Sequence, residues 1–125
     1  MCYLLERSTV DGAKWRRLIG GLLNKAGLKP RAVIKSSTGK VINGCECVYW
    51  GKGGRTVVCV LANKIHRATV SSFSVDISGE PLQAEIEFTV PVKDLVNERT
   101  GKTLGNGKRF TFLFNPWEAS VFSYK

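Results

Sequence analysis

The chain has 125 residues and a mass of 13.8 kDa, which suits one domain with its own buried core. Its composition is that of a soluble globular protein, with 43% hydrophobic and 10% aromatic residues, and its formal net charge is +9. No segment approaches the ~18 apolar residues that cross a bilayer, and Met1–Val10 lacks the apolar core and cleavage site of a signal peptide. We therefore expect a single cytoplasmic domain over residues 1–125 that does not associate with a membrane.

The four cysteines indicate a reduced protein without a metal site. Cys47 and Cys59 lie in strongly apolar runs, where a thiol behaves as a small hydrophobic group. Cys45 and Cys47 share one face of a predicted strand, and the residues that could complete a zinc site with them are Cys2, Cys59 and His66. Structural zinc sites favour Cys-x2-Cys spacing, so we expect no metal and no cofactor.

The positive charge is concentrated in the first part of the chain. Residues 1–70 hold thirteen Lys and Arg against three acidic residues, whereas residues 71–125 hold six against seven. This asymmetry suits nucleic acid or another polyanion, or an acidic partner subunit. The residues that could form a polyanion site are Arg16, Arg17, Lys25, Lys29, Arg31, Lys35, Lys64 and Arg67. A solvated basic surface is the simpler interpretation, because no aromatic or Gly-rich binding motif accompanies these charges.

An amphipathic helix is predicted before Pro30. Thr9 or Asp11 can cap its start, and Gly27 is placed to end it in a left-handed conformation. Apolar residues at helical spacing form one stripe, which consists of Trp15, Leu18, Ile19, Leu22, Leu23 and Ala26. The Gly20-Gly21 pair inside the helix indicates close approach to another backbone. Periodicity alone leaves open whether the stripe faces the core or an interface.

After Pro30 the apolar period changes from 3.6 to 2, which predicts antiparallel strands. The expected strands lie in Arg31–Ser36, Val41–Trp50, Thr56–Ala62, Phe73–Ile77, Glu85–Pro91, Val92–Val96, Phe110–Phe114 and Val121–Tyr124. Thr56–Ala62 is apolar on both faces, as expected of a central strand that is covered on both sides. Pro91 predicts a strand end or a sheet edge. Seven or eight such strands predict an antiparallel β-sandwich over residues 31–125, with the helical segment of residues 1–30 packed on it.

Four segments carry a family resemblance. V-K-D-L-V-N-E-R-T-G-K-T-L-G (Val92–Gly105) and R-F-T-F-L-F-N-P-W-E-A-S-V-F (Arg109–Phe122) resemble the closing β-domain of β-galactosidases of glycoside hydrolase family 42. G-G-R-T-V-V-C-V-L-A-N (Gly53–Asn63) is similar to a strand of that domain, and L-L-N-K-A-G-L-K-P (Leu22–Pro30) to the end of a helix before it. The resemblance implies a C-terminal sandwich that is not catalytic by itself, because the (β/α)8 barrel with its catalytic carboxylates has no counterpart in this chain.

The residues themselves predict no catalytic site. Glu85 and Glu87 share one strand face, but their alternation with Ile86 and Phe88 indicates a solvent-facing side rather than a glycosidase pair. No Ser-His-Asp arrangement, P-loop or G-x-G-x-x-G pattern is found. The aromatic residues that could form a platform for a sugar ring are Tyr49, Trp50 and Trp117.

We therefore expect a non-catalytic accessory or assembly module of the glycoside hydrolase tail type, which packs against a catalytic domain or a sister subunit. The first alternative is a stand-alone binding protein for nucleic acid or another polyanion. The second is a carbohydrate-binding module that uses the three aromatic residues.

Overall fold

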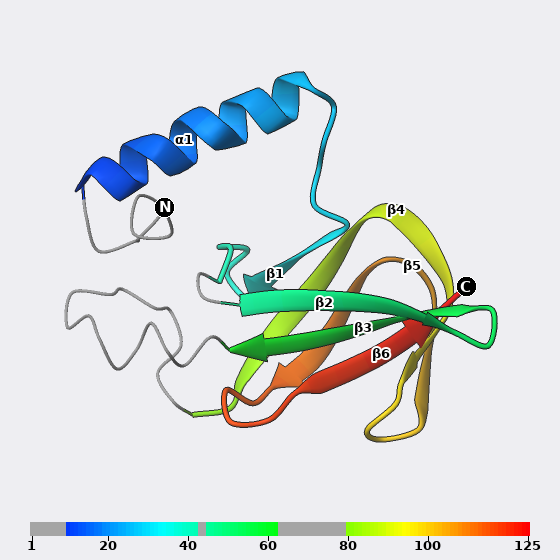
Figure 1. The fold of residues 1–125 in the computed structure, drawn as a ribbon. Helices are drawn as coiled ribbons and strands as arrows, with labels where there is room; N and C mark the ends of the chain where they lie inside the picture. Colours follow the sequence, from blue (N-terminus) through cyan, green and yellow to red (C-terminus); the bar gives the residue numbers. More distant parts are fainter. Residues whose placement is uncertain (1–9, 43–44, 63–79) are drawn as a thin grey trace.

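The structure, a computed structural model, describes residues 10–42, 45–62 and 80–125. The elements in chain order are α1 (Val10–Lys25), β1 (Ala32–Ser36), β2 (Cys45–Lys52), β3 (Arg55–Ala62), β4 (Leu82–Asn97), β5 (Lys102–Phe114) and β6 (Ser120–Tyr124). The predicted strand Phe73–Ile77 and residues Cys2, Lys64, His66 and Arg67 lie outside the described residues. Within them, the fold is mostly antiparallel β-sheet with one helix, as the sequence predicts (Figure 1).

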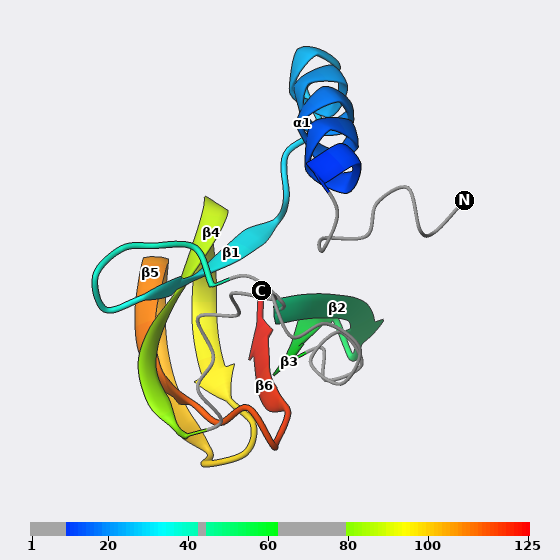
Figure 2. The same cartoon turned by 90° about the vertical axis from the view of Figure 1, so that its left-hand side faces the viewer.

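The six strands form one curled sheet that folds over itself (Figures 1 and 2). Strand β4 belongs to both sides of the fold: Ala84–Phe88 pair with β1, whereas Val96 and Asn97 pair with β6. Beyond β6 the sheet continues through β3 to β2, and β5 follows β4 along its length. One layer therefore contains β1 and the first half of β4, and the other contains β2, β3 and β6.

Of the two alternatives predicted for Pro91, the strand end is wrong, whereas an edge position agrees with the pairing: β1 pairs with β4 only up to Phe88, and β6 pairs with it only from Val96. β4 continues through the proline to Asn97, and the predicted strand Val92–Val96 is its second half. The pairing with β5 shifts register between Glu87 and Val92, so Pro91 lies where the ladder is interrupted and its missing N–H breaks no regular hydrogen bond. The irregular backbone here lets one strand bend from the first layer into the second.

The core lies between the layers and is filled by the alternate residues that the period of two predicts. Phe110, Phe112 and Phe114 all point inward from β5, as expected. Phe112 meets Phe122 of β6 edge-on, with ring centroids 5.1 Å apart, so aromatic packing joins the two layers. The remaining buried core residues come from β1, β3 and β4 and from Ile42 before β2, whereas β2 itself adds only the partly buried Cys45, Cys47 and Tyr49.

Helix α1 ends as the sequence predicts. Gly27 has a φ of 73°, its N–H donates to the Asn24 carbonyl at 3.0 Å, and the Leu28 N–H donates to the Leu23 carbonyl at 2.9 Å. These two bonds form a Schellman motif, which needs a residue with positive φ after the helix. Among the described residues, no helix has the length and hydrophobicity required to span a membrane.

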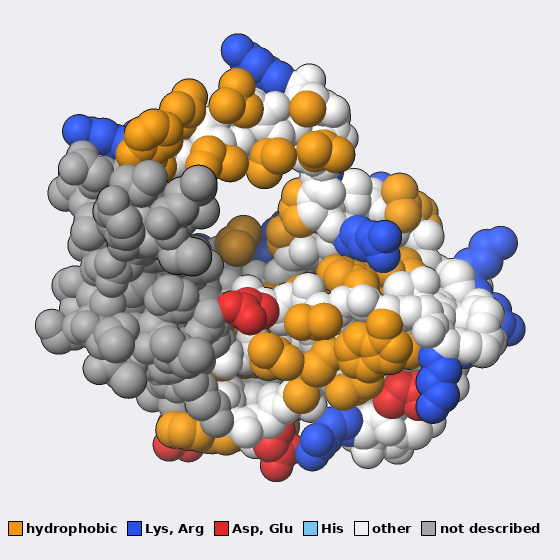
Figure 3. Space-filling view, in the orientation of Figure 1, with side chains coloured by type: hydrophobic (Ala, Val, Ile, Leu, Met, Phe, Trp, Pro, Cys, Tyr) orange, Lys and Arg blue, Asp and Glu red, His pale blue; other side chains and the backbone are white. Residues whose placement is uncertain are grey.

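The expectation that α1 packs on the sandwich is not met by the described residues. The helix stands away from the sheet, and an open space separates its apolar side from the body of the molecule (Figures 1 and 3). Trp15, Leu18 and Leu22 are 43%, 53% and 57% exposed. No described atom outside the helix lies within 4 Å of a Cβ built on Gly20 or Gly21, so the predicted close backbone approach is absent there.

Truncation of the core should unfold the sheet far more readily than truncation of the adjacent surface. Phe114 is 0% exposed and its neighbour Leu113 is 61% exposed on the other side of β5. We expect Phe114→Ala to lower the free energy of unfolding by about 3–5 kcal/mol, and Leu113→Ala by less than about 0.5 kcal/mol. Urea denaturation followed by tryptophan fluorescence measures both, and equal losses would contradict the assigned inner face of β5.

Candidate binding face on strands β2, β3 and β6

The second layer turns an apolar side away from the core. Val58, Val60 and Ala62 of β3 point into the core, so the alternate residues point outward. Register places Val48 of β2 opposite Cys59 and Cys59 opposite Val121 of β6. We call the outward-pointing apolar residues the outer face; they are Val48, Trp50, Val57, Cys59, Leu61 and Val121. Apolar side chains gather in patches on the front of the molecule over these strands, with charged side chains at the edges (Figure 3).

The outer face is exposed on β2, next to the strand β3 that the sequence predicts to be covered on both sides. β3 is central in the sheet, between β2 and β6, as expected. Val48 and Trp50 nevertheless remain 49% and 44% exposed beside it, whereas Val57 is buried beneath its neighbours at 8%. Burial also raises the pKa of the Cys59 thiol, which keeps that group neutral on the face. The described residues therefore cover one side of the layer and leave an apolar surface on the other.

A pocket of about 490 Å³ lies at one end of the outer face. Trp50, Val57 and Val121 supply its apolar walls. Its polar groups come from Lys52, Arg55, Glu98 and Ser123. The Ser123 hydroxyl donates to Oε1 of Glu98, which leaves the other carboxylate oxygen without a partner among the described residues.

Arg55 joins three strands beside this pocket. Its Nη1 donates to Oδ2 of Asp94 at 2.7 Å, its Nε donates to the Ser123 hydroxyl at 2.9 Å, and its Nη2 donates to the carbonyls of Asp94 and Ser123. The planar guanidinium can satisfy these directions at once, which an ammonium group cannot. Arg55 starts β3 directly after a tight turn at Gly53 and Gly54, whose φ angles are 58° and 75°.

Asp94 is held in an uncommon backbone conformation. Its φ is 54°, its N–H donates to Oδ1 of Asn106 at 2.8 Å, and the Nζ of Lys125 lies 3.4 Å from its Oδ2. The hydrogen bond from Arg55 and the nearby Lys125 charge hold the pKa of the Asp94 carboxyl below its ordinary value of 3.8. Sequence reasoning missed this group, because Arg55 and Asp94 are far apart in the chain and neither belongs to a local motif for an ion pair.

The three aromatic residues predicted to form a sugar platform are not brought together. Tyr49 points toward the core side of β2, where burial raises the pKa of its hydroxyl, and Trp50 points outward. Trp117 lies in the turn before β6, beyond Ser120, which pairs with Val60. Trp50 pairs with Val57, so the two tryptophans lie toward opposite ends of the layer.

The described basic residues that were predicted to bind a polyanion lie on α1, on its connection to β1 and on β1. Arg17 and Lys25 are exposed on α1, and Lys29 and Arg31 are exposed on the connection to β1. The Arg31 guanidinium lies over the Tyr49 ring, 5.3 Å from its centroid. Arg16 belongs to α1 by sequence position.

Lys35 pairs with Glu87 across strands β1 and β4, which removes it from the set of basic residues able to bind an anion. The same contact holds the pKa of Glu87 below its ordinary value. Glu85 is opposite Lys35 in the register and lies on the same outward side as Glu87. These two acids thus have the surface position that their alternation predicts.

Cys45 and Cys47 lie on the core side of β2, and burial raises the pKa of the Cys47 thiol. Cys59 points to the opposite side of the sheet. It is therefore separated from Cys45 and Cys47, with which it would have to bind a zinc ion. Within residues 10–42, 45–62 and 80–125, no three His, Cys, Asp or Glu side chains are grouped closely enough to hold a metal ion.

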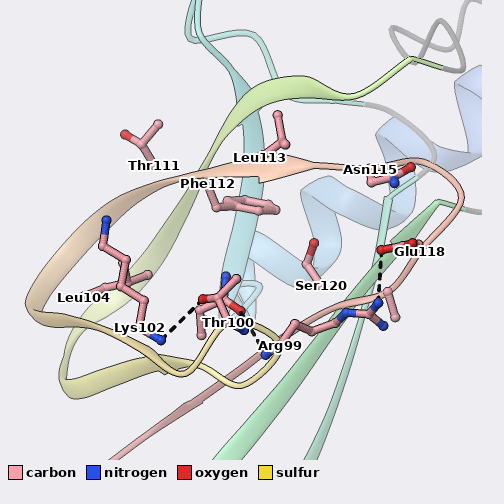
Figure 4. A pocket seen from close by; sticks show the side chains of 12 residues that line it. Arg99, Thr100, Lys102, Leu104, Thr111, Phe112, Leu113, Asn115, Glu118 and Ser120 are labelled. Atoms are coloured by element: carbon pink, nitrogen blue, oxygen red, sulfur yellow. Dashed lines mark hydrogen bonds and ion pairs between the residues drawn. The ribbon is translucent and has the colours of Figure 1, made fainter.

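A second pocket, of about 430 Å³, lies between the β4–β5 hairpin and the β5–β6 turn (Figure 4). An ion pair of 3.0 Å between Arg99 and Glu118 closes one side of it. Oδ1 of Asn97 accepts hydrogen bonds from the Arg99 and Thr100 N–H groups, and Oδ1 of Asn115 accepts one from the Trp117 N–H. These polar groups hold the two turns in place.

Comparison of the chain with protein-family models, with curated proteins and with solved structures finds no match. The resemblance to the closing β-domain of family 42 β-galactosidases therefore stays a prediction from the quoted motifs. The outer face, its pocket and the Arg55 contacts are the features from which a function has to be argued.

The contact between Arg55 and Asp94 should make the free energy of unfolding depend on pH in the acidic range. The pKa of Asp94 is lowered in the folded state, so the carboxylate stabilises the fold above its ordinary pKa of 3.8, and this contribution is lost as pH falls through the folded pKa. We expect the difference in unfolding free energy between wild type and Asp94→Asn to be constant above about pH 5 and to shrink below about pH 4. Asparagine tolerates the positive φ, so the change removes mainly the charge.

Urea titrations at pH 3, 5 and 7 measure this difference. Glu118→Gln is the control, because its ion pair with Arg99 is half exposed and should contribute less than about 1 kcal/mol. An Asp94→Asn effect of the same size at pH 3 and pH 7 would mean that the side chain acts through its backbone conformation and not through its charge.

Proposed function

We propose that this domain is a non-catalytic assembly module that binds a protein partner through the outer face of β2, β3 and β6. The observation that supports the proposal is the apolar outer face, on which Val48 and Trp50 of β2 are 49% and 44% exposed beside the buried and half-buried outward residues of β3. Large apolar side chains that are exposed side by side are costly in water and are typical of protein interfaces.

The composition of the face agrees with this role. Trp50 and the aliphatic residues are uncharged, whereas Lys52, Arg55 and Glu98 lie at one end of the face and Glu46, opposite Leu61, lies at the other end. An apolar centre with a polar rim is the usual arrangement of a protein interface. A catalytic domain or a sister subunit, which the family resemblance also implies, is the kind of partner that this surface suits.

Site-specific photo-crosslinking should detect the partner. A photoreactive residue placed at Val48 or Val121, in the cells that produce the protein, should give one discrete crosslinked species with the same partner at both positions. Leu113 is the matched control, because it is an exposed aliphatic residue on an outward side of β5. Equal crosslinking at all three positions, or none at Val48 and Val121, would overturn the proposed assembly role.

A second candidate, carbohydrate binding, is favoured by the pocket beside Trp50. An indole ring can stack on a sugar ring, and the Glu98 carboxylate and the Lys52 ammonium group can bond its hydroxyl groups. The polyanion alternative has weaker support, because its predicted residues are dispersed and Lys35 is paired with Glu87.

If the protein binds sugars there, Trp50→Ala should abolish retardation in affinity gels that contain β-linked galactan or cellulose. Trp117→Ala should leave it unchanged, because Trp117 lies outside this pocket. Equal loss in the two variants, or no retardation of the wild type on any polysaccharide, would remove this candidate.

A further inference from the structure

Two apolar surfaces of this chain lack a partner among the described residues. One is the outer face. The other is the stripe of α1, whose residues Trp15, Leu18, Ile19, Leu22 and Leu23 are 37–57% exposed. A 16-residue helix with three glycines is marginal in water unless a tertiary contact covers its apolar side. A helix stripe and an open sheet face are the two surfaces that pack on each other in layered folds.

The connection to β1 prevents α1 from covering the outer face of its own chain. The Leu28 N–H is bonded to the helix end at Leu23, and the carbonyls of Pro30 and Arg31 accept hydrogen bonds from Thr89 of β4. Only a short connection remains between these anchored points, and residues 28–30 span at most ~10 Å when extended.

The outer face belongs to the other layer of the fold. Strand β1 pairs with the first half of β4, whereas the outer face lies beyond β2, β3 and β6 (Figure 2). Layers of a sheet fold are ~10 Å apart and a helix is ~10 Å wide, so a helix on the outer face would have its axis roughly 15–20 Å from β1. The connection is too short to reach that position.

A second copy of the chain is free of this restriction. We propose that two copies form a two-fold symmetric dimer in which α1 of each lies on the outer face of the other. This inference rests on the proposed assembly role and names a sister subunit as the partner. Both surfaces of both chains are then covered by two identical contacts, and the assembly closes at two subunits.

The area is sufficient for a stable dimer. With large side chains contributing ~150–250 Å² each when fully exposed, the partly exposed residues of the stripe and the outer face amount to roughly 700 Å² per chain. A standard interface buries about 800 Å² on each partner. The stripe supplies about two-thirds of the area on each chain and the outer face about one-third, so neither surface alone reaches the standard size, which favours the use of both.

Light scattering coupled to size exclusion tests the dimer with one lysine on each surface. Leu22→Lys changes the stripe and Val48→Lys changes the outer face, and both positions are half exposed, so the fold of each chain should survive. We expect a dimer for the wild type, and at least a tenfold rise in the dissociation constant for each variant. Leu113→Lys, on β5, should remain dimeric. Circular dichroism confirms that each variant is folded.

Mixing the two variants distinguishes the proposed dimer, in which each α1 lies on the outer face of the other chain, from other dimers. We call the proposed assembly the exchange dimer. In an equimolar mixture, the intact helix of Val48→Lys can still bind the intact outer face of Leu22→Lys, so a heterodimer with one good contact should form. A dimer made by α1 against α1 would be lost in Leu22→Lys alone, and one made by two outer faces would be lost in Val48→Lys alone. Either of these patterns, or no recovery on mixing, would overturn the inference.

Disulfide trapping gives an independent test, because Cys59 is a native thiol on the outer face. In a background of Cys2→Ser, Cys45→Ser and Cys47→Ser, Leu22→Cys should yield a covalent dimer on mild oxidation, and a further Cys59→Ser change should abolish it. A wild type that stays monomeric at all concentrations would refute the exchange dimer. If Val48 and Val121 still crosslinked to another protein, the proposed assembly role would stand with a different partner.

Discussion

The fold depends on the bend of β4. One 16-residue strand pairs with β1 at its start and with β6 at its end, so its path decides how the two layers meet. The shift of register before Val92 and the positive φ of Asp94 turn the strand, and the guanidinium of Arg55 binds both Asp94 and Ser123. A charged side chain on β3 thus stabilises the unusual backbone of β4. Without that bend the sheet could not close over its aromatic core.

The same bend sets the chemistry of the surface. It puts the polar groups of Arg55, Glu98 and Ser123 next to Trp50, at one end of an otherwise apolar face. The result is a surface with a hydrophobic centre and a polar end. The hydrogen bonds of Arg55 and Ser123 at that end also join strands of the fold.

Local patterns in the sequence predict much of the structure. The period-two alternation in Cys45–Trp50 assigns Tyr49 and Trp50 to opposite sides of one strand, and the Gly27 end of α1 follows from the αL conformation that a helix terminus favours. The outer face is implicit in the double-sided hydrophobicity of Thr56–Ala62. The pocket beside Trp50 was not predictable, because Glu98 and Ser123 reach it from strands that no local pattern relates to β2.

The sequence by itself determined the fold class, the inward sides of the strands, the helix and its end, because each depends on periodicity or on the backbone preference of a few neighbouring residues. The tertiary structure alone shows that β4 passes through Pro91, that Arg55 meets Asp94, and that the helix stripe and the outer face are both exposed on the described part of the molecule. These features depend on pairing between distant segments, which no local pattern of hydrophobicity or charge encodes.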